Sequence, residues 1–185
     1  MPPETLVYAF KPYGEFSDNI SEAIVNSLST DDNLTTQVFD VQFSRSMFLS
    51  TLKNNIPDII IGLGQNPRAR KLQLERKALN LWSNKGKFPQ PIDRNGRPHL
   101  FVNLRLPRTL NTTVTYNAGT YVCNFSMYVF LNYCLNNGSK FAFIHVPVNF
   151  NVQAAADFVM HAIQFGNEKV SNSSDLKFER AIKPL

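Results

Sequence analysis

The sequence predicts an α/β domain in which helices cover both faces of a central, mostly parallel, twisted sheet, a three-layer α/β/α arrangement. Short apolar runs alternate along the chain with segments whose apolar residues recur at helical spacing, which is typical of parallel sheets with crossover helices. The chain has 185 residues, of which 43% are hydrophobic and 18% are charged. This length and composition predict one globular domain over 1–185 that buries a sizeable core.

The first third of the chain is expected to form two strands and two helices. A strand is expected at 5–9, and a loop that contains proline and glycine separates it from a helix capped by Asn19. Alternating apolar residues at 36–43 predict a second strand. The segment 44–55 carries apolar residues on one face and is expected to be a helix, which Pro57 ends.

The middle of the chain is expected to be rich in strands. A continuous apolar run at 58–63 predicts a buried strand. The segment 72–82 is compatible with a strand or a helix, and we assign it to a strand. Residues 85–98 are rich in glycine, proline and charge, so a surface loop is expected there. Short strands are expected at 100–104 and 112–116.

The last third is expected to form helix, strand and helix. A helix at 120–135 follows a small-residue turn, a buried strand lies at 140–148, and a final helix covers 152–165. Residues 166–185 are expected to form a polar C-terminal tail. Because open parallel sheets place their sites at the carboxyl ends of strands, we look there for functional residues.

Charge and cysteine content exclude several classes of protein. Nineteen Lys and Arg against fourteen Asp and Glu give a net charge of +5. The densest basic stretch, at 68–77, has no interleaved aromatic residues, so we expect a solvated face and no nucleic-acid partner. No secretory leader and no membrane-length apolar run are visible, so a cytoplasmic protein that does not associate with a membrane is expected. Two cysteines make neither a disulfide framework nor a metal cluster.

Cys123 is the best-placed nucleophile in the chain. It follows the turn Ala118-Gly119 and precedes an apolar helical pattern, which puts its sulfur near a helix N-terminus. The partial positive charge and free N–H groups there favour a thiolate and bind an oxyanion. The alternative is a small buried residue, the usual role of cysteine. That structural role is what we expect of Cys134, which lies well inside the same helix.

Two further residues complete a catalytic hypothesis. His145 lies at the end of an apolar strand, just before Pro147, where a base for a nucleophile can stand. Glu75 lies in a mixed apolar and basic segment and can orient an imidazole. A satisfied core histidine and an exposed glutamate are the alternatives. Because the chain offers one candidate for each of the three roles (nucleophile, base and orienting acid), an enzyme is one interpretation of the sequence.

Four segments, taken together, resemble the pyroglutamyl peptidase I (pyrrolidone carboxyl peptidase) family of cysteine peptidases. The resemblance covers about residues 5 to 165, and the third segment is the most specific. The segments are Phe-Lys-Pro-Tyr-Gly at 10–14, Pro-Asp-Ile-Ile-Ile-Gly-Leu-Gly at 57–64 with Glu-Arg-Lys-Ala-Leu-Asn at 75–80, Asn-Ala-Gly-Thr-Tyr-Val-Cys-Asn at 117–124, and Phe-Ile-His-Val-Pro at 143–147.

The resemblance implies a peptidase that removes an N-terminal pyroglutamyl residue from peptides through a thioester, without metal or cofactor. It implies that Cys123 is the nucleophile, His145 the general base and Glu75 its partner. N–H groups near Cys123 would hold the oxyanion. The residues that it implies for packing the lactam ring are Phe10, Tyr13, Phe16, Tyr121 and Val122.

The sequence also departs from that family. The arginine that helps the family's oxyanion has no counterpart, and Lys85 is the nearest cation. The stretch 108–116 is too short for the helix and strand that the family fits there. A second subunit, in a homo-oligomer, or the C-terminal tail would cover the sheet face left open. Two alternatives to the peptidase therefore stay open: a different hydrolase with the same triad, and a catalytically weak protein that binds blocked N-termini or small acyl amides.

Overall fold

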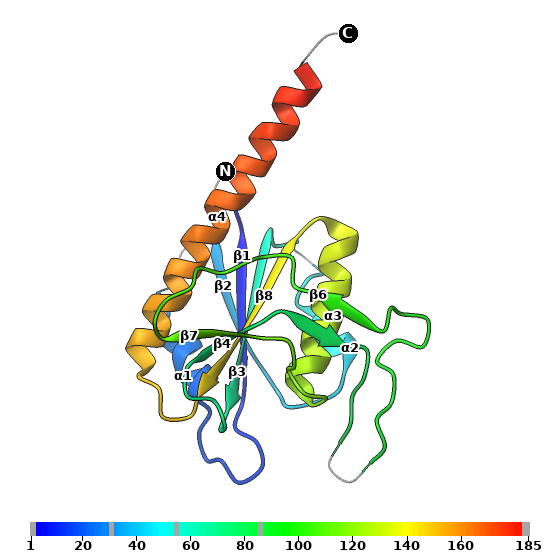
Figure 1. Ribbon diagram of the computed structural model, residues 1–185, viewed down its shortest axis with the longest axis vertical. Helices are drawn as coiled ribbons and strands as arrows, with labels where there is room; N and C mark the ends of the chain where they lie inside the picture. Colours follow the sequence, from blue (N-terminus) through cyan, green and yellow to red (C-terminus); the bar gives the residue numbers. More distant parts are fainter. Residues whose placement is uncertain (1–2, 30–31, 54–55, 85–86, 183–185) are drawn as a thin grey trace.

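The computed structural model describes residues 3–29, 32–53, 56–84 and 87–182, and of residues 169 and 171–182 it describes only the backbone. Its centre is a six-stranded sheet in the order β2-β1-β3-β8-β4-β7 (Figure 1). Every neighbouring pair is parallel except β4 and β8, which are antiparallel. The predicted mostly parallel sheet is therefore confirmed. Its strands are β1 (Thr5–Phe10), β2 (Leu34–Phe39), β3 (Ile59–Asn66), β4 (Leu72–Glu75), β7 (Thr112–Thr115) and β8 (Lys140–Pro147).

Helices cover both faces of this sheet, which confirms the three-layer prediction. On one face α1 (Ile20–Ser27) contacts α4 (Val152–Ile182) and four of the strands. On the other face α2 (Arg45–Ser50) contacts α3 (Val122–Asn137), which packs on β3 and β8. Figure 1 shows the two helical layers on opposite sides of the sheet. Asn19 caps α1 as predicted, since its side chain accepts a hydrogen bond from the N–H of Ser21.

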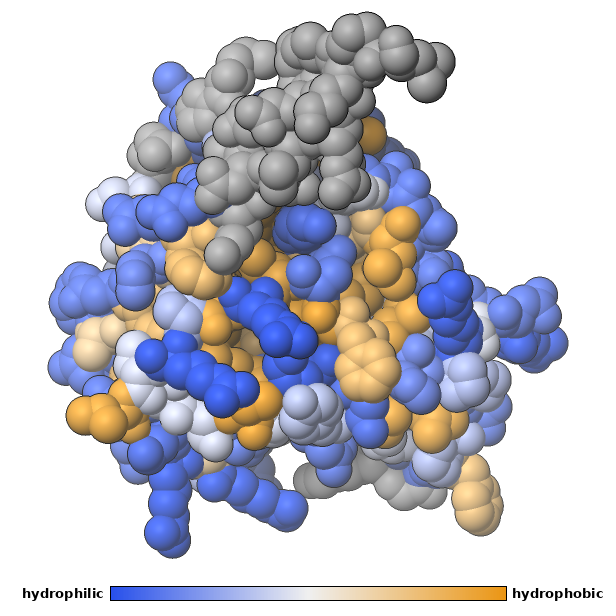
Figure 2. Space-filling view, turned by 45° about the horizontal axis from the view of Figure 1, so that its top comes forward, coloured by the Kyte–Doolittle hydropathy of each residue, from blue (hydrophilic) through white to orange (hydrophobic). Residues whose placement is uncertain are grey.

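The core lies on both faces of the sheet, and the part between the sheet and α3 is rich in aromatic residues. Tyr8 is fully buried and contacts Phe10, Phe39 and Phe130 with ring centroids 4.7–5.9 Å apart. Phe48 adds the apolar face of α2 to the same cluster. Ring edges and faces meet at these distances with favourable electrostatics as well as buried area. On the face of the molecule that Figure 2 shows, apolar residues gather toward the middle and hydrophilic residues occupy most of the periphery.

Several boundaries differ from the sequence prediction. The segment 72–82 forms two short strands, β4 and β5 (Lys77–Leu79), with Arg76 between them. β5 leaves the main sheet and pairs with β6 (His99–Phe101). The strand expected at 36–43 lies at β2, and the helix expected at 44–55 ends at Ser50. Pairing decides these limits, because a residue without a neighbouring strand or a surface to pack on gains nothing from regular structure.

The last helix is longer than predicted. The segment 166–185, expected to be a polar tail, is helical through Ile182. No proline interrupts the sequence between Val152 and Pro184, so nothing ends the helix at 165. The segment 102–111 contains no helix, in line with its short length. At Gly166, α4 passes so close to Ile59 and Leu104 that a Cβ there would come within 2.9 Å of Ile59 Cδ1.

Asn124 connects the start of α3 to the two-stranded sheet of β5 and β6, and its replacement is our first prediction. Its fully buried carboxamide accepts from the N–H of Leu79 (2.8 Å) and donates to the carbonyls of Leu79 (2.9 Å) and Leu81 (2.8 Å). Asn124→Ala leaves these groups unpaired, so we expect the free energy of unfolding in urea to fall by about 2–4 kcal/mol. Asn136→Ala, which loses one exposed bond to Asn132, is the control, expected to stay within about 0.5 kcal/mol. Equal losses for both variants would contradict this role.

Candidate active site

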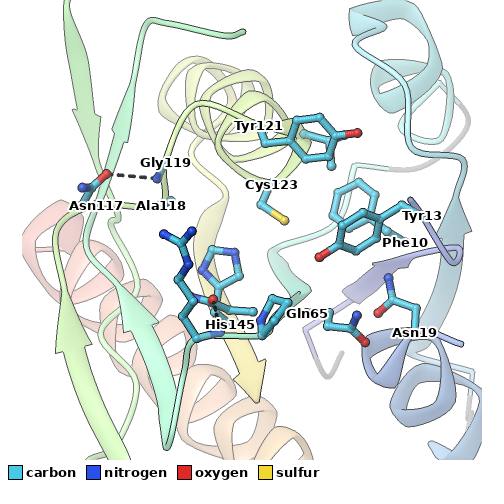
Figure 3. A pocket seen from close by; sticks show the side chains of 14 residues that line it. Phe10, Tyr13, Asn19, Gln65, Asn117, Ala118, Gly119, Tyr121, Cys123 and His145 are labelled. Carbon is cyan, nitrogen blue, oxygen red and sulfur yellow. Dashed lines mark hydrogen bonds between the residues drawn. The ribbon is translucent and has the colours of Figure 1, made fainter. Parts of the chain in front are cut away.

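A pocket of about 510 Å³ opens at the carboxyl ends of β1, β3 and β8, beside the start of α3 (Figure 3). This is where the sequence pattern places a site in an open parallel sheet. The lining residues come from each of these elements and from the loops that follow them. They are Phe10, Tyr13, Asn19, Gln65, Asn66, Pro67, Arg68, Asn117, Ala118, Gly119, Tyr121, Val122, Cys123 and His145.

Cys123 is the second residue of α3, which confirms its predicted place at a helix N-terminus. The chain reaches this point through Gly119, whose φ of +75° favours glycine and whose N–H donates to Asn117 Oδ1 (3.0 Å). No side chain caps this helix. The first amides of α3 therefore remain able to donate to an oxygen that lies beside the sulfur.

His145 and Glu75 form a buried pair below the sulfur. Their exposed fractions are 5% and 2%, and His145 Nδ1 lies 2.8 Å from Glu75 Oε1. Glu75 comes from β4, whose antiparallel register with β8 sets it opposite Phe143, two residues from His145 on the same face. The hydroxyl of Thr115 on β7 donates to the other oxygen of Glu75. With Nδ1 bound to the carboxylate, the imidazole has Nε2 left for Cys123, which lines the same cavity.

The charges of this group favour a protonated imidazole. Burial lowers the pKa of His145, but the interaction with Cys123 and the charge and hydrogen bond of Glu75 outweigh it and raise the pKa to about 9. The imidazolium form of His145 is therefore favoured near neutral pH. Cys134 differs in kind, because burial raises the pKa of its thiol to about 12. It is a packing residue, as predicted.

Gly64 on β3 makes room for the sulfur and the imidazole. A Cβ at this position would lie 2.7 Å from Cys123 Sγ and 3.2 Å from His145 Cδ2. Neither side chain could keep its place against a methyl group there. The glycine of this strand is therefore a requirement of the site.

The structure brings together most of the residues that the resemblance implies for the pocket. Phe10, Tyr13, Tyr121 and Val122 line the cavity that holds Cys123 and His145. Phe16 does not; it packs on Tyr13 with ring centroids 5.4 Å apart and lines a neighbouring hollow. Figure 3 shows Phe10, Tyr13 and Tyr121 on one side of the sulfur. Lys85, the cation considered for the oxyanion, lies outside the described residues.

Gln65, Asn66 and Arg68 are among the lining residues that the sequence analysis did not predict. Gln65 is 6% exposed, and its Oε1 accepts from the N–H of Ile20 (3.0 Å). Its Nε2 is buried and makes no hydrogen bond within the described part of the chain. Asn66 and Arg68 follow it. The available signal was their position directly after a buried strand.

The described residues contain neither a grouping of metal ligands nor a membrane-spanning helix. In 3–29, 32–53, 56–84 and 87–182, no three His, Cys, Asp or Glu side chains are grouped so that they could hold a metal ion. No helix in these ranges has both the length and the apolar character needed to cross a membrane.

Comparison with known proteins agrees with the fold. Residues 4–160 match the family model described as pyroglutamyl peptidase. The chain is 31% identical over 166 residues to pyrrolidone-carboxylate peptidase 1 of Caldanaerobacter subterraneus subsp. tengcongensis, covering 77% of this chain and 81% of that protein. It is 25% identical over 165 residues to pyrrolidone-carboxylate peptidase 1 of Saccharolobus solfataricus, covering 78% of each.

Solved structures show the same fold. The pyrrolidone carboxyl peptidase of Thermococcus litoralis superposes with a TM-score of 0.83 at 22% identity, over 92% of this chain and 96% of that one. The pyroglutamyl peptidase I of Bacillus amyloliquefaciens gives 0.80 at 22% identity, over 90% and 96%. The match of the family model over most of the sequence, together with the identity to curated relatives, establishes that this chain belongs to the pyroglutamyl peptidase family.

Proposed function

We propose that this protein is a cysteine peptidase that removes an N-terminal pyroglutamyl residue from peptides. The observation that carries the proposal is one cavity that holds Cys123 beside His145, with Glu75 hydrogen-bonded to the imidazole from behind, and that has an aromatic wall at one end. Membership of the family supports the same activity.

The pocket suits an uncharged N-terminus. A flat lactam can pack between the rings of Phe10, Tyr13 and Tyr121. The buried, unpaired Nε2 of Gln65 can donate to the lactam carbonyl and so gain its missing partner. Among the described lining residues there is no carboxylate to neutralise a free α-ammonium group. An ordinary charged N-terminus would therefore lose its hydration without compensation, and the site selects blocked peptides.

The mechanism follows from the positions of the three side chains. The Cys123 sulfur attacks the pyroglutamyl carbonyl, and a carbon–sulfur bond forms as the oxygen becomes an oxyanion held by the first amides of α3. The carbon–nitrogen bond then breaks, and His145 gives its proton to the leaving amine. Water, deprotonated by His145, attacks the thioester, and free pyroglutamate leaves as the thiolate returns. Glu75 holds the imidazole and stabilises its charged form.

The amides of α3 are proposed to stabilise the oxyanion without the family's arginine. Helix N-terminal amides are fixed dipoles that need no reorganisation during the reaction. Losing one oxyanion donor lowers a rate by on the order of 10²–10³-fold. We therefore expect measurable turnover that is slower than that of a peptidase with the same triad and the additional arginine.

The test combines turnover with selective labelling. The protein, in reducing buffer, should release aminomethylcoumarin from its pyroglutamyl amide and leave the alanyl amide intact. Iodoacetamide near neutral pH should stop the reaction and label Cys123, because that thiol is accessible and paired with an imidazolium, whereas buried Cys134 stays unlabelled. Added 2-pyrrolidone should slow the labelling by occupying the aromatic end.

Two results would count against the proposal. Rapid alkylation of Cys123 without hydrolysis of the pyroglutamyl amide would favour a different hydrolase or a binding protein. Absence of both alkylation and hydrolysis in a folded protein would make Cys123 a structural residue.

A further inference from the structure

We propose that Arg68 makes this enzyme prefer pyroglutamyl peptides whose next residue carries a carboxylate. The inference rests on the proposed function, since it concerns the part of the substrate that leaves. The carboxylate is the side chain of Asp or Glu, or the α-carboxylate when that residue is the last one.

The cavity has two ends, and the chemistry assigns one to each part of the substrate. Figure 3 shows Phe10 and Tyr13 on one side of Cys123, and Asn117, Ala118 and Gly119 on the other, beyond His145. The lactam ring belongs to the aromatic end. His145 must reach the nitrogen of the leaving residue to protonate it. The leaving residue therefore extends toward the end that Asn117 and Gly119 line.

Arg68 belongs to that second end. It comes two residues after Asn66, the last residue of β3, which pairs with Pro147 of β8 just past His145. The side chain of Asn66 donates to Gln73 Oε1 (2.8 Å), and Gln73 is the cross-strand partner of His145. The N–H of Arg68 donates to Asn66 Oδ1 (3.0 Å). These bonds fix the base of the loop beside His145. The backbone of Arg68, from which the guanidinium extends, is therefore held in place.

Arg68 is the only permanently charged side chain among the described residues of the cavity wall. No carboxylate within the described chain forms an ion pair with it. The nearest acid of the site, Glu75, is buried and bound to His145 and Thr115. A guanidinium binds a carboxylate through two parallel hydrogen bonds, and here a substrate carboxylate meets no competing partner. The guanidinium of Arg68 thus favours substrates whose leaving residue carries a negative charge.

The test uses peptide pairs that differ only in charge. Amidated pyroglutamyl-Glu is compared with amidated pyroglutamyl-Gln, and pyroglutamyl-Ala with its amide, by release of the leaving amine. We expect kcat/KM to be about two- to fivefold higher for the charged member, a range set by the weak stabilisation that an exposed ion pair gives. The preference should shrink in high salt. The first pair reports on a side-chain carboxylate and the second on an α-carboxylate; a preference in either pair supports the inference and names its source.

Arg68→Gln should bring the two rates together by lowering the rate on the charged peptide alone. Arg70→Gln is the matched control: Arg70 lies in the same loop but lines a different hollow with Pro147 and Phe150, so the preference should remain. Equal wild-type rates within both pairs would overturn the inference. So would an equal fall on charged and neutral peptides in Arg68→Gln, which would instead show stabilisation of the oxyanion. If Arg70→Gln lost the preference for charged peptides to the same extent, the preference would come from the net charge of the protein and not from Arg68, and the inference would be wrong.

Failure of the proposed function gives a different result. If no pyroglutamyl peptide is cleaved, the peptidase assignment is wrong. The role of Arg68 in binding carboxylates is then tested by measuring, by calorimetry, the affinity of the wild-type protein for the same peptide pairs. Tighter binding of the charged members, abolished by Arg68→Gln, would support it. Equal affinities, or no binding of any of the peptides, would overturn it.

Discussion

Cys123→Ala is expected to lower kcat/KM for a pyroglutamyl coumarin amide by on the order of 10⁵-fold. Without the sulfur no thioester can form, and only substrate binding and oxyanion stabilisation remain. The pocket itself should persist, because Cys123 is half-buried and alanine fits the start of a helix. The measurement is turnover by purified protein, with circular dichroism to show that the fold is kept.

Cys134→Ala is the matched control, since it removes the other sulfur from the same helix. Cys134 is fully buried and does not line the cavity, so activity should stay within about twofold while stability falls by about 1–2 kcal/mol. Full activity in Cys123→Ala would show that another residue is the nucleophile, or that another peptidase is present in the preparation.

Glu75→Gln is expected to reduce kcat by on the order of 10²–10⁴-fold. The amide is nearly isosteric, but it carries no charge to stabilise the imidazolium. It can also present an N–H to Nδ1 and so favour the wrong tautomer of His145. The hydroxyl of Thr115 can still donate to the remaining side-chain oxygen of the glutamine. The substitution therefore changes only the charge of residue 75 and the hydrogen-bond donors that it presents to His145. Substrate affinity should change little, because Glu75 lies behind His145 and outside the cavity wall.

The pH dependence separates this effect from simple unfolding. The pKa of His145 is about 9, above its usual 6.5. The ion pair with Glu75 therefore contributes its full stabilisation below about pH 6.5 and loses it as the pH rises through about 9. Wild-type kcat/KM should fall along an alkaline limb near pH 9, where the imidazolium loses the proton that the leaving amine needs. This limb belongs to the coupled cysteine–histidine pair.

In Glu75→Gln the alkaline limb should move to lower pH. Burial, which lowers the pKa of His145, remains, while one of the groups that raises it has gone. The comparison is the pH profile of kcat/KM for the two proteins, with melting temperatures at each pH as the control. A limb that stays in place would show that Glu75 acts only through packing.

The main sheet and its helices could be predicted because their patterns are local. The apolar runs at β3 and β8 are too continuous for a solvent-facing strand, and Asn19 caps α1 with the hydrogen bond that its side chain predicts. The limits of β2, α2 and β4 could not be predicted in this way. They depend on where a neighbouring strand or helix ends, which no local pattern contains.

The site could be predicted in part for the same reason. Cys123 and His145 carry local signals, a helix start and a strand end, and the structure shows both. The signal of Glu75 was weak, because its segment also suits an exposed glutamate. Only the antiparallel register of β4 with β8 sets it behind His145. Phe16, which resembles a pocket residue in sequence, lines the neighbouring hollow, since it packs on the outer face of Tyr13.

The sequence by itself therefore determined the fold class, the place of Cys123 at a helix start and the place of His145 near a strand end. Helical spacing, caps and apolar runs are properties of neighbouring residues, and the chain records them directly. Only the tertiary structure decided which polar groups meet: Glu75 lies against His145, and the buried amide of Gln65 and the guanidinium of Arg68 lie in the wall of one pocket. Electrostatic interaction depends on distance and burial in space, and both are set by the packing of strands that lie far apart in the chain.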